Sequence, residues 1–210
     1  MLRLRRGLAI FANFAFVFKL VIITGPDFFP EEAGAAASLL AELDCRIHLR
    51  KPGSTELQMR GLIEALPEEF RPRLTLQDHL QLAPEYGVGG VHPTSRFPEI
   101  PPGWRGLVSR SCHSLDELAM CRDADYMFLS PVFDSISKSG YASAFSDAQL
   151  REAAGRQIGP RVYALGGVRP ENFPLLREYG FGGAALLGHV WKDSSADGLS
   201  KVIAEIKRYI

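Results

Sequence analysis

Two predicted strands late in the chain end in glycine, a placement that suits the binding of a phosphate group. The apolar run 162–167 closes on Gly166 and Gly167, and the run 184–188 closes on Gly188. Backbone N–H groups can approach a phosphate closely only where no side chain intervenes, and glycine provides that access. We therefore expect a phosphorylated small-molecule ligand at the ends of these strands.

Polar side chains also follow the other predicted strands. The strand 125–130 breaks at Pro131 into a loop that an ordinary solvated segment could equally form. Asp78 opens a predicted helix, where an acidic residue is favoured whether or not it binds a metal. The complete set of strand-end residues is Thr24, His48, Arg50, Lys51, Gln77, Asp78, His79, His92, Ser111, His113, Ser130, Ser135, Ser137, Lys138, Gly166, Gly167 and Gly188.

Hydrophobic periodicity predicts eight strand–helix units that would position these ends. The strands are predicted at 19–24, 45–49, 72–77, 89–92, 106–110, 125–130, 161–166 and 182–187, and the helices at 30–43, from Ser54, 78–86, 114–122, 146–156, 170–179 and 194–209. Ser54 offers a cap without a capping box, and the Pro-rich segment 93–103 is not expected to form a regular helix. The alternation predicts an α/β fold, a single-domain (β/α)8 TIM barrel over residues 19–210, with functional side chains at the carboxyl-terminal rim of the strands.

Length and composition fit one such domain. The chain has 210 residues, and its 24 basic and 24 acidic residues cancel, so charge gives no reason to expect nucleic acid or an anionic membrane as a partner. Its three cysteines form no C-x-x-C pair. That spacing argues against a disulfide framework or a zinc ribbon and favours a reducing, cytoplasmic location.

Residues 1–18 form a predicted N-terminal extension of the barrel. A basic start with Arg3, Arg5 and Arg6 precedes an apolar run through Phe18, a pattern shared with signal peptides. No small-x-small cleavage site separates this run from the first strand, and Asn13 interrupts it well before the roughly 20 apolar residues of a membrane span. We expect the extension to be dispensable for the fold.

In this order and spacing, the motifs resemble the thiamin phosphate synthase/TenI family. They comprise His48, Arg50 and Lys51; Gln77 and Asp78; His92; Ser111 and His113; the segment 130–138; and the segment 164–172. The resemblance covers about residues 19–192 and implies a barrel that holds a thiazole phosphate at its strand ends. It assigns substrate and phosphate binding to His48, Arg50, Lys51, Ser111, Ser135, Ser137, Lys138, Gly166, Gly167 and Gly188.

The family contains two reactions with different demands. The synthase joins an aminopyrimidine pyrophosphate to the thiazole phosphate and releases pyrophosphate with the help of Mg²⁺, which prefers carboxylate and phosphate oxygens. Here Asp78 matches one magnesium aspartate of the family. Pro52 stands where the synthases have lysine, and no carboxylate follows His92 until Glu99. The resemblance therefore implies a synthase site that lacks one cation and one metal ligand, into which Arg96 or Lys51 could move.

The second reaction, thiazole tautomerisation by TenI-type members, needs no metal. It requires a phosphate anchor and one acid–base residue, and His113 aligns with the histidine to which the family gives that proton transfer. Histidine suits the task because its unperturbed pKa lies near operating pH. We narrowly favour the tautomerase on these grounds. The synthase and a non-catalytic thiazole- or thiamin-phosphate binder remain as alternatives, and oligomeric state is left open.

Overall fold

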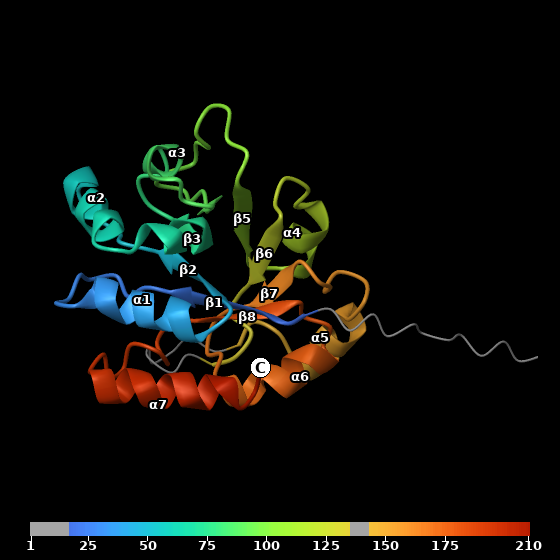
Figure 1. Ribbon diagram of the computed structural model, residues 1–210. Coiled ribbons are helices and arrows are strands. Elements are labelled where there is room, and N and C mark those ends of the chain that lie inside the picture. Colours follow the sequence, from blue (N-terminus) through green and yellow to red (C-terminus); the bar gives the residue numbers. More distant parts are fainter. Residues whose placement is uncertain (1–16, 135–142) are drawn as a thin grey trace, which may run out of the picture.

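The chain folds into a closed barrel of eight parallel strands, which confirms the predicted (β/α)8 architecture. The computed structural model describes residues 17–134 and 143–210 (Figure 1). Each strand pairs with the next in sequence, and the last pairs with the first. The strands are β1 (Lys19–Ile23), β2 (Cys45–Leu49), β3 (Leu74–Leu76), β4 (Gly90–Val91), β5 (Leu107–Cys112), β6 (Tyr126–Leu129), β7 (Val162–Ala164) and β8 (Gly183–Leu186).

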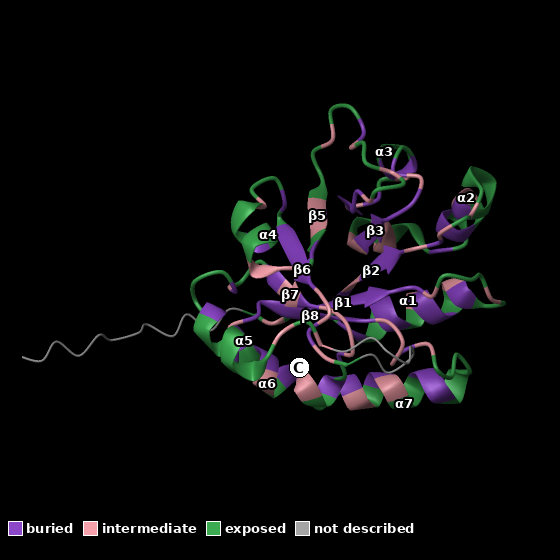
Figure 2. Cartoon of the chain, turned by 180° about the vertical axis from the view of Figure 1, so that it is seen from behind, coloured by how far each residue is buried: buried purple, intermediate pink, exposed green. Residues whose placement is uncertain are grey.

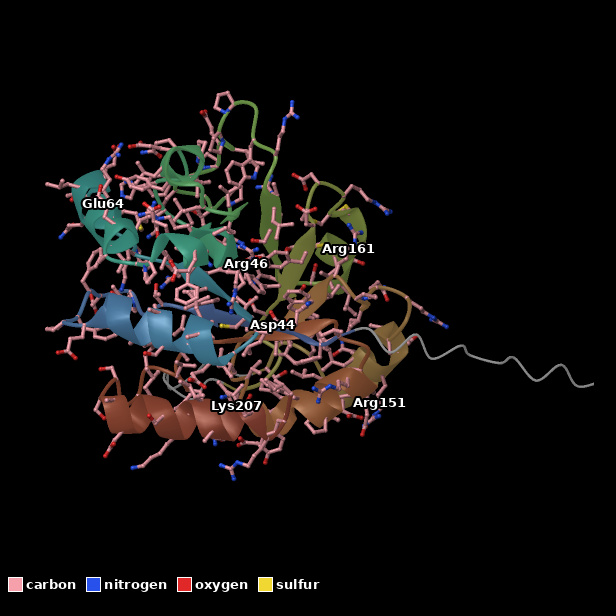
Figure 3. All side chains as sticks on the ribbon, viewed as in Figure 1. Asp44, Arg46, Glu64, Arg151, Arg161 and Lys207 are labelled. Carbon is pink, nitrogen blue, oxygen red and sulfur yellow. The ribbon has the colours of Figure 1, made fainter. Side chains whose placement is uncertain are left out.

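Helices connect the strands and surround the barrel. They are α1 (Glu32–Glu42), α2 (Glu56–Glu64), the 3-10 helix η1 (Glu68–Arg73), α3 (Leu82–Tyr86), α4 (Leu115–Met120), α5 (Asp147–Ala153), the 3-10 helix η2 (Pro170–Asn172), α6 (Phe173–Glu178) and α7 (Ala196–Lys207). Their inner faces are buried and their outer faces exposed (Figure 2). Arg151 of α5 and Lys207 of α7 are charged side chains at the helical surface (Figure 3).

Alternation along the strands divides the core into two layers. In β1, Leu20 and Ile22 belong to the large cluster formed with the helices. Val21 and Ile23 belong instead to a smaller cluster with Tyr126, Phe128 and Ala185. Successive residues of a strand therefore face the helices and the barrel interior in turn, which leaves the strand ends as the place where side chains can meet a ligand.

Part of the barrel interior is polar. Arg46 of β2 (Figure 3) donates hydrogen bonds to the carbonyls of Leu74 (2.8 Å) and Pro72 (3.1 Å). Thr75, His48 and Ser109 are also buried, each with no more than a trace of exposure. The interior thus combines an apolar half with a hydrogen-bonded half on β2 to β5.

Several predicted boundaries are wrong by a few residues. Strand β3 begins at Leu74 because η1 takes up residues 68–73. Helix α2 is capped by Thr55, not Ser54, and Thr55 forms a full capping box with Gln58. The segment 93–103 contains no helix, as its prolines predicted.

Residues 1–16 of the predicted extension lie outside the described residues. Phe18 packs its ring on Phe173 of α6, with centroids 5.3 Å apart, and Arg177 lies over the same ring. No helix in the described part of the chain is both long and apolar enough to cross a membrane.

Candidate active site

The polar rim begins where β1 and β2 end. The Thr24 hydroxyl accepts a hydrogen bond from the backbone N–H of Arg50 (2.9 Å) and donates to its carbonyl (3.2 Å). This pair of bonds fixes the backbone of Arg50. Within residues 17–134 and 143–210, no side chain accepts a hydrogen bond from the half-buried Arg50 guanidinium. Arg50 therefore stands on a fixed backbone, and its guanidinium has no counter-ion among the described residues.

Lys51, expected to bind substrate, is instead fully buried. Its ammonium donates to the Glu32 carboxylate (2.5 Å) and to the carbonyls of Gly25 (3.0 Å) and Asp27 (2.7 Å). Three acceptors use all three ammonium protons. Burial raises the pKa of Glu32, against the opposing effect of Lys51. In this arrangement Lys51 secures the β1–α1 loop and offers no proton to a ligand.

Asp78, the expected magnesium ligand, lies at the end of β3 with both oxygens already bonded. One accepts from the backbone N–H of Lys51 (2.7 Å) and the other from the Arg96 guanidinium (3.1 Å). Across the described parts of the chain, no group of three or more His, Cys, Asp or Glu side chains is placed to hold a metal ion. A divalent cation at Asp78 would face a guanidinium and not a second carboxylate, so these residues do not fit a protein-held Mg²⁺.

His48, expected to contact substrate, is enclosed in the barrel. Its Nδ1 accepts from the Gln77 amide (2.8 Å), and its Nε2 lies 2.6 Å from the Tyr126 hydroxyl. Burial, reinforced by His92 and Arg46, holds the pKa of His48 well below its usual value. Both ring nitrogens are satisfied in the neutral state, so His48 supports the site from beneath.

His92 and Ser111 continue this network toward the rim. His92 hydrogen bonds through Nδ1 to Ser109 (2.8 Å) and through Nε2 to Ser111 (3.1 Å). Burial, followed by the charge of Arg110, lowers the pKa of His92 to about 4. Ser111 itself is exposed at the end of β5. Its hydroxyl remains a candidate substrate contact, oriented by a neutral imidazole.

His113, the candidate acid–base residue, is exposed just beyond β5. Its Nδ1 lies 3.1 Å from the Ser130 carbonyl, which can only accept, so Nδ1 carries the proton. The backbone N–H of His113 donates to Glu117 (2.6 Å), and Ser114 caps α4 as predicted. Among the described residues, Nε2 of His113 has no hydrogen-bond partner. That nitrogen is the free basic atom at the rim.

The glycines that follow β7 and β8 form the remaining part of the rim. The loop after β6 pairs with the residues that follow β7. The backbone N–H groups of Val132 and Phe133 donate to the carbonyls of Leu165 (2.9 Å) and Gly166 (3.0 Å). Gly167 has φ +65°, and a Cβ there would lie 2.2 Å from the Asp134 carbonyl. Crowding and backbone conformation alone therefore require glycine at this position.

Free backbone amides accompany these glycines. Within the described residues, the N–H groups of Gly166, Gly167, Gly188 and His189 donate to no acceptor. Orphan amides at two adjacent strand ends are the groups that a phosphate would satisfy. Ser135, Ser137 and Lys138, expected to contribute to the same site, lie outside the described residues.

Two residues important to the rim were not assigned a binding or metal role from the sequence, although Arg96 was named as a cation that could move into a synthase site. Glu32, the partner of Lys51, appears in the sequence only as an acid in the first turn of a helix. Arg96, the partner of Asp78, lies in a Pro-rich segment without periodicity. The absence of a carboxylate after His92 was the available signal that Asp78 would need another partner.

Fold and rim together define a (β/α)8-barrel protein whose strand ends carry free guanidinium, imidazole and amide groups. The family model described as thiamine monophosphate synthase matches residues 21–190. The crystal structure of thiamine phosphate pyrophosphorylase from Bacteroides thetaiotaomicron superposes with a TM-score of 0.82 at 31% identity, over 91% of this chain and 97% of that one. The thiamine-phosphate synthase of Halalkalibacterium halodurans is 24% identical over 203 residues, 90% of this chain and 95% of the relative. This chain belongs to the thiamin phosphate synthase/TenI family and is an enzyme of thiamin biosynthesis.

Proposed function

We propose that this protein is a thiamin phosphate synthase. The relatives described above carry that activity in their names, including a structure at 31% identity. They favour the synthase over the tautomerase, which the sequence alone narrowly favoured. Because the family consists of enzymes, a purely non-catalytic binder is not retained.

The proposed reaction is a displacement at carbon. The thiazole nitrogen forms a bond to the methylene carbon of the aminopyrimidine, and the carbon–oxygen bond to pyrophosphate breaks. Pyrophosphate leaves with the bonding electron pair, and positive charge develops on the pyrimidine as it departs. Catalysis therefore depends on groups that stabilise the departing anion more strongly in the transition state than in the ground state.

The observation that carries this proposal is the unpaired guanidinium of Arg50. It stands at the end of β2 on a backbone fixed by Thr24. A guanidinium binds phosphate oxygens through two parallel N–H groups, and one without a side-chain acceptor among the described residues is available to stabilise the charge that develops. A thiazole tautomerase has no leaving pyrophosphate that would require this cation.

The thiazole phosphate is proposed to bind across the barrel from Arg50. The free amides of Gly166, Gly167 and Gly188 would hold its phosphate, with Ser135, Ser137 and Lys138 as further predicted contacts. Ser111 is proposed to contact the substrate between the two anionic groups. In this assignment, backbone N–H groups bind the phosphate of the thiazole, which remains in the product, and guanidinium groups bind the departing pyrophosphate.

Kinetics of Arg50 variants test the proposal. With aminopyrimidine pyrophosphate and thiazole phosphate as substrates, we expect Arg50→Ala to lower kcat/KM by roughly 100- to 1000-fold, as the loss of one transition-state donor does. Arg50→Lys should recover part of the activity because it keeps the charge but not the fork. Arg105→Ala, at an exposed arginine before β5, is the control. Equal rates for Arg50→Ala and the control would contradict the proposal.

A second candidate function, thiazole tautomerisation, rests on the free Nε2 of His113. The Ser130 carbonyl fixes the tautomer in which this nitrogen is basic. Direct assay of proton exchange on the thiazole carboxylate phosphate distinguishes this reaction from the synthase. Exchange without formation of thiamin phosphate would favour the tautomerase.

A further inference from the structure

We propose that Arg96, held by Asp78, joins Arg50 in receiving the leaving pyrophosphate, and that pyrophosphate binds to this protein without a divalent metal. The inference rests on the proposed synthase function and names the residue that takes the place of a metal ion. The residues around Asp78 do not match a magnesium site, because both carboxylate oxygens are already bonded within the protein.

The surroundings of Asp78 hold its carboxylate in a position to bind an arginine. Its side chain is 1% exposed, and one oxygen is bonded to the backbone of Lys51, which fixes the direction of the carboxylate. The other oxygen accepts from Arg96 Nη2 at 3.1 Å. A buried carboxylate with one fixed oxygen and one bound to a guanidinium has its charge compensated within the protein.

Neighbouring contacts hold the Arg96 loop against β3. His79, directly after Asp78, has a left-handed backbone with φ +54° and packs its ring on Phe97, with centroids 5.0 Å apart. Its Nε2 also lies 2.8 Å from the Ser54 carbonyl, on the loop after β2. Asp78 and His79, adjacent residues just after β3, thus bind Arg96 and Phe97, adjacent residues of the loop after β4. The strained conformation of His79 is a local cost that these contacts sustain.

Arg96 keeps donors available for a ligand. A guanidinium has five N–H groups, and the hydrogen bond to Asp78 uses one nitrogen. The side chain is 49% exposed, so its remaining edge is open to a molecule arriving at the rim. A half-exposed guanidinium anchored at one corner is suited to bidentate binding of a phosphate.

The other cation of this region cannot substitute for it. Lys51 is fully buried, and Glu32 and two carbonyls accept all of its ammonium protons. Of these three cations, Arg50 and Arg96 remain available: Arg50 directly follows β2, and Arg96 lies in the loop after β4. Both belong to the strand-end loops on either side of β3, and two guanidinium groups suit a ligand with two phosphoryl groups.

Calorimetric titration with inorganic pyrophosphate tests the inference without requiring turnover. We expect wild-type protein to bind pyrophosphate in the presence of EDTA, and added Mg²⁺ to change the affinity by less than about threefold. Arg96→Ala should weaken binding in EDTA by roughly 10- to 100-fold, the range for lost hydrogen bonds to a charged group. Arg96→Lys should fall between the two, and Arg105→Ala, verified as folded by circular dichroism like the others, should match wild type.

The opposite results are equally clear. Pyrophosphate binding that requires Mg²⁺ in the wild type, or an Arg96→Ala variant that binds like wild type in EDTA, would overturn the inference. If the proposed synthase function were wrong, the binding and activity measurements would give a different combination of results. Metal-free, Arg96-dependent binding of pyrophosphate without any thiamin phosphate formation would support the inference and contradict the proposed function.

Discussion

At the scale of single residues, His113 separates the two reactions of the family. Its tautomer is fixed by the Ser130 carbonyl, and the free Nε2 could move a proton. Displacement of pyrophosphate by the thiazole nitrogen requires no proton transfer at that atom. The two proposed reactions therefore differ in whether they need His113.

We predict that His113→Ala lowers the rate of thiamin phosphate formation by less than about tenfold, because the proposed displacement needs no general base. The measurement is steady-state kinetics across pH, with His113→Gln as a variant that retains a hydrogen-bonding side chain. A loss of roughly 10² to 10⁴, together with a missing limb of the pH profile, would assign His113 an acid–base role.

Sequence reasoning located the rim residues but not all of their partners. The position of Asp78 at a strand end followed from periodicity, whereas its bond to Arg96 depends on how a segment without periodicity folds back. Lys51 was expected at the ligand because it lies one residue before the position where the synthases have a lysine. Successive residues point in different directions where a strand ends, and Lys51 turns toward Glu32.

At the scale of elements, the Lys51–Glu32 pair fastens helix α1 and its preceding loop to β2. The pair is completely enclosed, with side-chain exposures of 0% and 3%. The second oxygen of Glu32 is buried and has no hydrogen-bond partner among the described residues. Removal of one charge would leave the other buried and uncompensated, which is more costly than the pair itself is stabilising.

We predict that Glu32→Gln lowers the free energy of unfolding by about 3 kcal/mol, the low end for breaking a buried pair. Urea denaturation measures the change. Glu31→Gln, the same substitution at the exposed neighbouring residue, should shift stability by no more than about 0.5 kcal/mol. Equal stabilities of the two variants would show that the enclosed pair does not hold the loop.

The contact between the loops that follow β6 and β7 gives a second prediction at this scale. Gly167→Ala would place a Cβ 2.2 Å from the Asp134 carbonyl at φ +65°, so the β6 loop must move. Because this loop precedes Ser135, Ser137 and Lys138, we expect thiazole phosphate to bind at least about tenfold more weakly, with a backbone strain of roughly 1–2 kcal/mol contributing to the change. Gly159→Ala, which meets no atom within 4 Å, is the control for calorimetric titration. Unchanged affinity in Gly167→Ala would contradict the proposed phosphate site.

At the scale of the whole molecule, the eight-unit barrel was predictable because hydrophobic periodicity repeats along the chain. The boundaries of the elements were less predictable. Helix η1 occupies the first residues predicted for β3 because Pro72 supplies no N–H to a strand ladder. The polar interior was also missed. His48 and His92 were expected at the rim, and their burial depends on partners on other strands, Tyr126 for His48 and Ser109 for His92.

These two histidines predict a loss of stability in acid. The pKa of His92 falls from 6.5 to about 4 on folding, and that of His48 is lowered well below 6.5. Between these values the unfolded chain binds protons that the folded chain does not, so stability present above pH 6.5 is lost as pH falls. Each histidine contributes a slope of up to about 1.4 kcal/mol per pH unit.

Urea denaturation over the same pH interval measures this slope. His92→Asn should reduce it by the share of one histidine, whatever its effect on stability at neutral pH. A slope that is the same in wild type and His92→Asn would show that His92 is protonated in the folded protein.

The most direct test of the proposed function is the stoichiometry of products. Wild-type protein is incubated with aminopyrimidine pyrophosphate and thiazole phosphate, and thiamin phosphate and pyrophosphate are quantified together. We predict that both appear in equal amounts and only when both substrates are present. Absence of thiamin phosphate, from folded protein that binds thiazole phosphate, would contradict the assignment as a synthase.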